Sequence, residues 1–346
     1  MSENTRSAVL PIDRRTFIAG AGSLAALTLG VGPVLAQAPA ADVAVIENRA
    51  QIAHTAFCWW RTDVPAEVSY DYWRDVHGLV AARVPGLWQY RQLQIGPNRQ
   101  DLWPAIPGVS FENRMDRQPQ GMPQGLFLTA EHLKAFGDNP VVGTHIFNDE
   151  RNFVARLGTQ MSPPGRARTF VDRVGRPQLQ GEPPYPSFAV CFVPRDGVGI
   201  EAFHSFLADQ VARPWAANAG VTRLRLQPLE RYDINAWNSP GIDHRWPAER
   251  EYWGYIELSI REPQVAAALL GSSFDGTAFA RHVEAVHSYP IDAVYTIVQG
   301  GRPTEVGLRG YPAVRTIEQA GADNQRNPEL LRVLYGDAVL GIERLR

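Results

Sequence analysis

The hydrophobic and polar positions of this chain follow the same order twice. In each half, a short run of alternating apolar and polar residues is followed by a longer run with apolar residues three or four positions apart. Two more alternating runs, a second long run and a last alternating run complete each half. Alternation is typical of a strand with one buried face, and the longer spacing is typical of an amphipathic helix. The pattern therefore predicts strand, helix, strand, strand, helix, strand in both halves.

These runs set the predicted bounds of the elements. In the first half we expect strands near residues 54–61, 87–95, 125–129 and 167–174 and helices near 66–84 and 130–157. In the second half we expect strands near 187–193, 221–229, 252–260 and 293–298 and helices near 200–219 and 263–288. This is the order of the split βαβ, or ferredoxin-like, unit. The predicted fold class is therefore α+β, with two such units in tandem.

Matching residues indicate that the two halves arose by internal duplication. Residues 56–63 and 189–196 share an alanine, a cysteine, an aromatic residue and an aspartate at the same positions, and Cys58 falls on Cys191. The same offset aligns aromatic residues of the helices that follow. A self-similar period of this kind is the sequence signature of a repeated structural unit.

The repeat also predicts the domain boundaries. We expect a first unit at 45–174, a proline-rich linker at 175–186, a second unit at 187–300 and a C-terminal arm at 301–346. Two helices are predicted in the arm, near 313–320 and 328–335. We expect the arm to pack across the two halves.

The N-terminal segment reads as an export signal. Arg14 and Arg15 precede an apolar run that is interrupted by glycines and ends in small residues. This pattern predicts a twin-arginine signal peptide at residues 1–36, cleaved after Ala36. The alternative is an uncleaved membrane anchor. We expect a periplasmic or secreted protein that meets the twin-arginine export machinery and no membrane after cleavage.

Charge and cysteine content exclude several classes of function. The formal net charge is −2 and no basic run is present, which argues against a nucleic-acid partner and against an anionic membrane surface. Cys58 and Cys191 are the only cysteines, so we expect two buried thiols and no disulfide framework. No spacing of His, Cys and acidic residues predicts a metal site.

The predicted helix 66–84 carries the first candidate catalytic residue. Tyr70, Trp73, His77 and Val84 fall three, four and seven residues apart and form one inward stripe with a single ionisable ring. Burial would favour the neutral imidazole, which can take a proton near neutral pH. The alternative is a hydrogen-bonded core histidine. The second half has glutamine or valine at the equivalent position, so the fold of the unit does not require the imidazole.

The first strand carries the second candidate. Alternation places His54 on the same face as Cys58 and other small residues, with large aromatic residues on the opposite face. If that face lies against the helix of His77, the two imidazoles and Tyr90 from the next strand converge on one cavity. The alternative for His54 is a solvated residue at a strand end. Arg91, next to Tyr90, is expected to face solvent.

Long insertions separate the second and third strands of both halves. Residues 97–124 and 230–251 are rich in proline and glycine and carry several tryptophans, including Trp103. Loops of this length in a compact domain are usually functional, so they are candidate lids over a site. The alternative is that they only cover the ends of the barrel.

One stretch resembles a known family. Residues 72–78 read Tyr-Trp-Arg-Asp-Val-His-Gly and are followed by Pro85, Gly86 and Tyr90. This is similar to the first helix and second strand of the EthD family, small ferredoxin-like proteins of the dimeric α+β barrel superfamily. The resemblance covers about residues 53–95.

The resemblance implies that the two units form a pseudo-dimeric α+β barrel within one chain, as relatives with a single unit do by pairing. It also implies a range of activities. Related barrels act without cofactors as dehydratases, decarboxylases or cyclases on aromatic and polyketide-like carbonyl compounds. A cofactor-independent lyase or isomerase acting on a small hydrophobic molecule is therefore expected, with His77 as general acid or base and His54 and Tyr90 as orienting or second proton-transfer groups. The residues expected to hold a flat hydrophobic ligand are Tyr70, Trp73 and Trp103.

Two other functions stay open. Phe274-Asp275-Gly276, with His282 and His287, resembles part of the haem site of dye-decolourising peroxidases, although Ser272 replaces the first glycine of their motif. A non-catalytic periplasmic binding protein would use the same cavity without chemistry. No cofactor is expected, with haem as the alternative, and further oligomerisation is left open.

Overall fold

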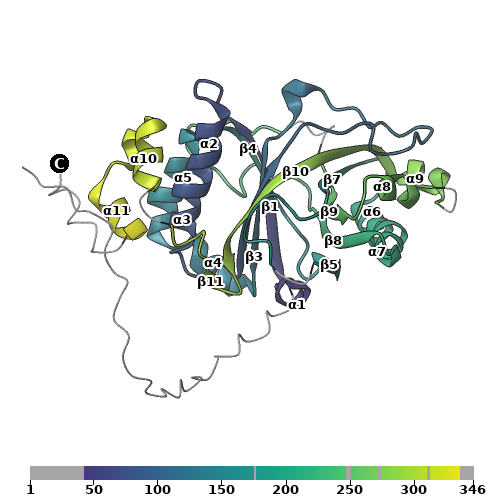
Figure 1. Ribbon diagram of the computed structural model, residues 1–346, viewed down its shortest axis with the longest axis horizontal. Helices are drawn as coiled ribbons and strands as arrows, with labels where there is room; N and C mark the ends of the chain where they lie inside the picture. The colour runs from purple at the N-terminus through teal and green to yellow at the C-terminus, as the bar shows by residue number, and fades with distance from the viewer. Residues whose placement is uncertain (1–42, 175–176, 247–250, 272–273, 310–311, 336–346) are drawn as a thin grey trace, which may run out of the picture. The chain divides into compact units, whose positions relative to one another are not determined.

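The computed structural model describes residues 43–174, 177–246, 251–271, 274–309 and 312–335. The predicted signal peptide therefore lies outside the described residues. Within the described residues, no helix has the length and apolar character needed to cross a bilayer. The fold is a mixed α/β arrangement around a large antiparallel sheet (Figure 1).

The first half contributes four neighbouring strands. They are β1 (Ile52–Trp60), β2 (Gln89–Ile95), β3 (Gly121–Phe127) and β4 (Val154–Met161), in the spatial order β4-β1-β3-β2. The helical segment between β1 and β2 is α2 (Ala66–Tyr72), the π-helical η1 (Trp73–His77) and α3 (Gly78–Ala81). Between β3 and β4 lie α4 (Ala130–Gly137), the π-helical η3 (Val142–Ile146), α5 (Phe147–Asp149) and the 3-10 turn η4 (Glu150–Asn152).

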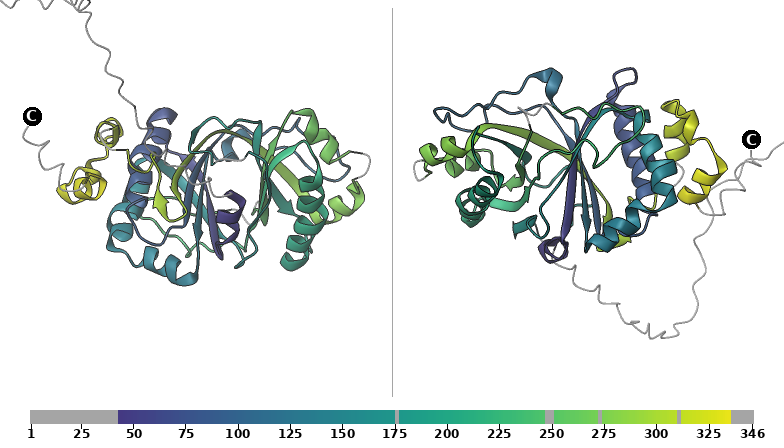
Figure 2. Two further views of the ribbon diagram at one scale, coloured as in Figure 1. Left: turned by 60° about the horizontal axis from the view of Figure 1, so that its bottom comes forward. Right: turned by 180° about the vertical axis from the view of Figure 1, so that it is seen from behind.

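The second half has the same strand order. Its strands are β7 (Ser187–Pro194), β8 (Val221–Pro228), β9 (Gly254–Ile260) and β10 (Val283–Gln299), in the order β10-β7-β9-β8. Its helices are α6 (Ile200–Phe206), the π-helical η5 (Leu207–Ala212), α7 (Arg213–Ala217), α8 (Gln264–Leu269) and α9 (Gly276–His282). Figures 1 and 2 show the helices of the two halves on opposite sides of the strands.

Two strands join the halves. The first part of β10 pairs with β7 and its second part pairs with β2, while β5 (Arg168–Asp172) pairs with β8. Pro290 marks the change of partner within β10, a place where a missing backbone N–H is tolerated. The short strands β6 (Gln180–Gly181) and β11 (Arg302–Pro303) also pair with β10, and α1 (Val43–Asn48) contacts β5.

Two predicted boundaries were wrong. The fourth strand of the first half is β4, which begins at Val154 inside the predicted helix 130–157, and the predicted strand 167–174 is the separate strand β5. The predicted helix 263–288 is two short helices, and β10 already begins at Val283. In both cases pairing with a neighbouring strand overrides the local periodicity.

The sequence alignment that matched Cys58 with Cys191 is one residue out of register with the structure. Cys58 lies in the core cluster between the sheet and the helices of the first half, whereas Cys191 lies in the cluster enclosed by the two halves of the sheet. A shift of one residue moves a side chain to the opposite face of a strand. Both cysteines are buried free thiols, as predicted.

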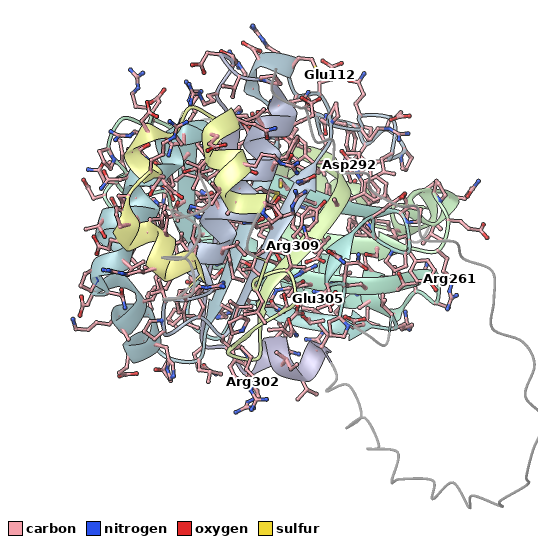
Figure 3. All side chains as sticks on the ribbon, turned by 60° about the vertical axis from the view of Figure 1, so that its left-hand side comes forward. Glu112, Arg261, Asp292, Arg302, Glu305 and Arg309 are labelled. Atoms are coloured by element: carbon pink, nitrogen blue, oxygen red, sulfur yellow. The ribbon has the colours of Figure 1, made fainter. Side chains whose placement is uncertain are left out.

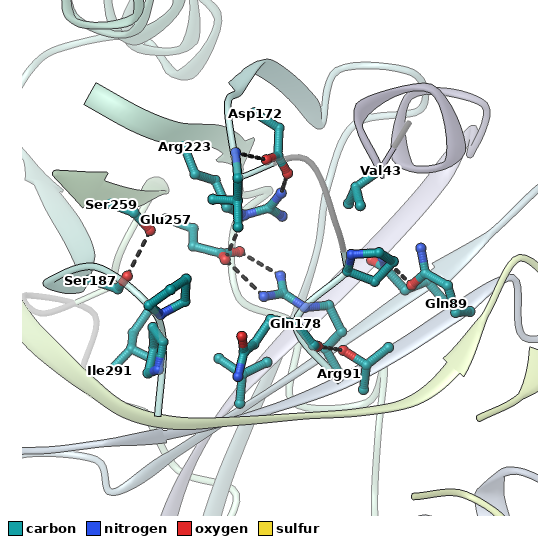
Figure 4. A pocket seen from close by; sticks show the side chains of 17 residues that line it. Val43, Gln89, Arg91, Asp172, Gln178, Ser187, Arg223, Glu257, Ser259 and Ile291 are labelled. Atoms are coloured by element: carbon teal, nitrogen blue, oxygen red, sulfur yellow. Dashed lines mark hydrogen bonds and ion pairs between the residues drawn. The ribbon is translucent and has the colours of Figure 1, made fainter. Parts of the chain in front are cut away.

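Arg91 does not face solvent. It is 5% exposed, and its guanidinium lies 2.7 Å from the Glu257 carboxylate of the other half (Figure 4). Arg223 bonds the same carboxylate at 2.8 Å and also pairs with Glu47 and Asp172. Burial alone would raise the pKa of Glu257, but Arg223 and Arg91 outweigh it, so the pKa is lowered. This buried network connects the two halves.

The C-terminal arm packs on the first half through its helices and pairs with β10 of the second half through β11, so it contacts both halves as expected. Its helices are α10 (Pro312–Gln319), the 3-10 turn η7 (Asp323–Gln325) and α11 (Pro328–Tyr335). They contact α2, η1, α3 and α5, and their apolar side chains belong to the core cluster of the first half (Figure 3). Arg309, labelled in Figure 3, lies 3.5 Å from Asp75 of η1.

Candidate functional site

A cavity between the sheet and the helices of the first half collects the three predicted catalytic residues. His54 from β1, His77 from η1 and Tyr90 from β2 all line it. Its volume is about 50 Å³, room for a few waters or a small ligand. The other lining residues are mostly apolar, with two exceptions that matter for chemistry, Glu150 and Trp237.

His77 belongs to a buried pair with a carboxylate. Its Nδ1 lies 2.9 Å from Oδ1 of Asp149, and both side chains are buried. Burial by itself lowers the pKa of His77, but the charge and hydrogen bond of Asp149 and the charge of Glu150 outweigh it, so the pKa is raised. The pKa of Asp149 is also raised, because burial outweighs the effect of His77.

The pair fixes the orientation of the imidazole. When Nδ1–H donates to Asp149, the neutral ring keeps its lone pair on Nε2. The described residues offer Nε2 no hydrogen-bond partner, while the ring lines the cavity. His77 can therefore accept a proton from a molecule in the cavity, with Asp149 stabilising the resulting imidazolium.

Glu150 is a second proton-transfer candidate, which the sequence did not reveal. Its carboxylate accepts hydrogen bonds from Trp237 Nε1 at 3.1 Å and from Ser239 Oγ. Burial raises its pKa to about 7, although His77, Ser239 and Trp237 oppose the shift. The adjacent acids Asp149 and Glu150 were the available signal. It was missed because they fell inside a predicted helix, whose exposed face usually carries such residues.

His54 supplies a neutral ring. It lies between the rings of Phe127 and Trp237, with centroids 5.8 Å and 6.2 Å away. Burial lowers its pKa to about 4, and its buried Nδ1 has no hydrogen-bond partner among the described residues. Gly125 makes room for it, since a Cβ there would lie 1.9 Å from His54 Nε2. His54 is thus suited to accept or donate a hydrogen bond without carrying charge.

Tyr90 keeps its hydroxyl proton available. The hydroxyl oxygen accepts from Trp73 Nε1 at 3.3 Å and from Gln92 Nε2 at 3.4 Å. Burial raises its pKa well above the usual range, so the group stays protonated. With two donors already on the oxygen, the O–H is free to donate to a ligand oxygen.

Two of the predicted ligand-holding residues do not line the cavity. Trp73 is buried behind Tyr90 as its hydrogen-bond donor. Tyr70 packs edge-on against Trp60, 5.2 Å between centroids, and donates to the backbone oxygen of Gln120. Both expectations are corrected, because the helix turns this part of the stripe into the core and not toward the cavity.

The third, Trp103, lies in the other half. It stacks on Trp215 of α7 with centroids 5.2 Å apart, and its Nε1 donates to Ser288 Oγ at 2.7 Å. Trp237, from the second insertion, lines the first-half cavity, where Trp103 was expected. Its ring packs on that of Phe147, with centroids 4.6 Å apart. Each insertion thus covers the other half, which its position in the chain could not show.

The crossing is reciprocal in the backbone. Ser110 of the first insertion forms a parallel bridge with Ala285 of β10, and Asp243 of the second insertion forms one with Arg156 of β4. Each insertion is therefore held by a strand of the opposite half, the first insertion by β10 and the second by β4.

Of the two haem-candidate histidines, His287 has no ring nitrogen left for an axial ligand among the described contacts. Both ring nitrogens of His287 form hydrogen bonds. Nδ1 bonds the Tyr252 hydroxyl at 2.7 Å, and Nε2 bonds the backbone carbonyl oxygen of Glu112 at 3.1 Å. His282 stacks on Phe206 with centroids 4.2 Å apart, and its Nδ1 bonds the oxygen of Ala278. His287 lies buried in β10, and His282 is partly buried at the end of α9.

The described part of the chain also has no group of three or more His, Cys, Asp or Glu residues placed to hold a metal ion.

Comparisons with known proteins give distant structural similarity. No family model and no curated protein matches the chain. A putative monooxygenase from Lactobacillus acidophilus matches with 8% identity and a TM-score of 0.39, over 73% of this chain and 99% of that one. An anthrone oxidase-like protein matches with 10% identity and a TM-score of 0.43, over 72% and 94%. A mutant chlorite dismutase from Candidatus Nitrospira defluvii matches with 15% identity and a TM-score of 0.32, over 69% and 92%. At TM-scores below 0.5, these similarities carry no argument about the activity of this chain.

Proposed function

We propose that this protein is a cofactor-independent enzyme that transfers protons on a small hydrophobic or aromatic carbonyl compound, as a lyase or isomerase. The observation that supports this most is the buried pair of His77 and Asp149, whose imidazole lines an apolar cavity. A positioned base, a carboxylate behind it and a hydroxyl donor are the groups that removal of a proton next to a carbonyl requires.

In the proposed reaction His77 Nε2 removes a proton from the carbon next to the carbonyl. The C–H electron pair forms a C=C bond, and the π pair of the carbonyl moves onto its oxygen, which accepts a hydrogen bond from Tyr90. An isomerase returns the proton to another carbon of the substrate. A dehydratase uses the proton of His77 or Glu150 to release hydroxide from the neighbouring carbon as water. The apolar walls exclude bulk water and strengthen these interactions.

The size of the cavity limits the substrate. About 50 Å³ admits a small compound, and a fused-ring substrate requires Trp237 to move. Trp237 is held by hydrogen bonds to Glu150, whose raised pKa couples this contact to proton transfer. The second insertion therefore serves as the cover of the site in this proposal.

The wider assignment is part of the same proposal. The shared order β4-β1-β3-β2 and β10-β7-β9-β8, and the π-helical segments η1 and η5 at equivalent places, support two tandem ferredoxin-like units in a pseudo-dimeric α+β barrel of EthD type. The twin-arginine signal supports export to the periplasm. The N-terminal sequence of protein recovered from the periplasm tests both the export and the cleavage after Ala36.

Deuterium exchange tests the activity without a known substrate. Small enolisable aryl ketones and aldehydes are incubated with the protein in D2O, and loss of the proton next to the carbonyl is followed by NMR. We expect one or more compounds to exchange faster than in buffer, with His77→Gln lowering the rate by about two to four powers of ten. His132→Gln, an exposed histidine of α4, is the matched control.

Two outcomes contradict the proposal. Exchange within a few-fold of the parent in His77→Gln removes His77 from the mechanism. Saturable binding of the same compounds, with no exchange and no product, identifies a binding protein in place of an enzyme.

A further inference from the structure

A second cavity lies on the opposite face of β1. It has a volume of about 40 Å³ and shares no lining residue with the first cavity. Trp59 from β1 and Trp246 from the second insertion line it, with ring centroids 5.2 Å apart and an edge-on arrangement. Residues of both halves thus build an aromatic-walled site that the proposed reaction does not use.

The charged residues around this cavity are arginines. Arg117, Arg156 and Arg245 line it, and none of the described acidic residues does. Asp243 pairs with Arg156 at 3.0 Å and with Arg245 at 2.9 Å, and Asp116 lies 4.0 Å from Arg117. Asp116 also pairs with Arg114, at 3.0 Å. Among the described residues, the three lining guanidinium groups therefore face two carboxylates, which leaves an excess of positive charge. The cavity favours an anion and disfavours a cation.

The polar lining residues Asn113, Tyr252 and His287 carry no negative charge that could balance the arginines. Burial lowers the pKa of His287 to about 4, so the ring is neutral at neutral pH. Its Nε2–H donates to the Glu112 carbonyl, and its Nδ1 accepts from the Tyr252 hydroxyl. The Tyr252 oxygen in turn accepts from Tyr289, which accepts from Asn113 Nδ2. Each hydroxyl and ring proton in this series of hydrogen bonds is donated to the next residue, so the Tyr252 hydroxyl has no proton left to donate to a ligand.

Two donors in the cavity walls lack partners. The Nε1 atoms of Trp59 and Trp246 are buried, and the described residues give them no hydrogen-bond partner. Buried indole N–H groups usually have an acceptor, and leaving one unpaired costs about 1–3 kcal/mol. A carboxylate is an acceptor-only group with room for several donors.

We propose that this cavity binds a small carboxylate that carries a flat aromatic group. The arginines meet the charge, the indole N–H groups of Trp59 and Trp246 are the unused donors, and the aromatic walls accept the ring. The volume admits the carboxylate and the nearest part of the ring, with the remainder toward the exposed side chain of Arg245. The inference is independent of the proposed reaction.

Binding of three probes tests the proposal on the mature protein. Benzoate carries both the charge and the ring, acetate carries the charge alone, and benzyl alcohol carries the ring alone. We expect benzoate to bind saturably, by calorimetry or tryptophan fluorescence, at least about tenfold more tightly than either of the others. Equal binding of acetate overturns the aromatic part of the proposal, equal binding of benzyl alcohol overturns the anionic part, and no saturation at millimolar benzoate overturns both.

Variants locate the binding. Arg117→Gln and Trp59→Phe are each expected to weaken benzoate binding about tenfold, because one removes a charge and the other removes an indole N–H while keeping an aromatic ring. Arg99→Gln, an exposed arginine of the same insertion, and His77→Gln at the first cavity are the controls and should bind like the parent. A loss of binding in His77→Gln would place benzoate in the first cavity and overturn the assignment. Thermal melting confirms that each variant is folded.

Discussion

His77 and Asp149 are 72 positions apart in the sequence, and Nδ1 of the first lies 2.9 Å from Oδ1 of the second. The two residues come from the first and second helical segments of the same half, where η1 and α5 meet over the cavity. Oδ2 of Asp149 is buried and has no partner among the described residues. The main function of the carboxylate in this structure is therefore to orient the imidazole of His77 and to stabilise its protonated form.

Asp149→Asn should change the pH dependence of the reaction as well as its rate. Asp149 raises the pKa of His77, so its neutralisation lowers that pKa and moves the rise of activity with pH to lower pH. We expect kcat to fall by at least about tenfold with little change in KM, since the residue does not touch the substrate. The pH profile of kcat for any compound found by exchange is the measurement. An unmoved profile with an altered KM would mean that Asp149 acts only on the shape of the site.

Glu150 makes the protein less stable as pH rises. Its pKa is raised from 4.5 to about 7 in the folded state, so the folded state binds this proton more tightly than the unfolded state. The contribution is complete below pH 4.5, is lost as pH rises through about 7, and amounts to at most about 3 kcal/mol. The raised pKa values of His77 and Asp149 act in the same direction.

Glu150→Gln tests this dependence, because glutamine keeps the size and does not titrate. We expect denaturant unfolding to show a smaller loss of stability with rising pH in the variant than in the parent. Parallel curves for the two proteins over this range would show that Glu150 has an ordinary pKa.

Gly125→Ala should damage the first cavity. A Cβ there would lie 1.9 Å from Nε2 of His54, whose ring is confined between Phe127 and Trp237. We expect a loss of about 1–3 kcal/mol in the free energy of unfolding, typical of an overpacked core. Gly143→Ala is the control, because no atom lies within 4 Å of its Cβ in η3, and alanine there should be neutral or stabilising. Equal stability of the two variants would mean that His54 can move aside freely.

Glu257→Ala should be among the most destabilising single changes. It leaves Arg91 and Arg223 buried without their shared carboxylate, and breaking a buried pair in this way costs about 3–5 kcal/mol. Asp116→Ala removes an exposed partner of Arg114 and should leave the free energy of unfolding nearly unchanged. Urea unfolding of both variants is the measurement. A small effect at Glu257 would show that water reaches this part of the sheet.

The helix stripe and the strand alternation were sufficient to predict which faces meet. They placed His77 on an inward face of one element and His54 on the small-residue face of another, and the two do line one cavity with Tyr90. The same reasoning failed for Trp103, because an irregular insertion has no helix or strand periodicity from which the direction of a side chain could be predicted. It failed for Glu150 because β4 was not recognised, which left the residue inside a helix.

The sequence alone determined the order of most of the elements and the inward faces that carry His54 and His77. These follow from residue spacing along a chain whose periods are fixed by backbone geometry. Only the tertiary structure decided the partners: Asp149 for His77, Glu257 for Arg91, and each insertion for the opposite half. Such contacts join residues far apart in the chain, and their choice depends on the packing of whole elements and on the need to pair every buried charge.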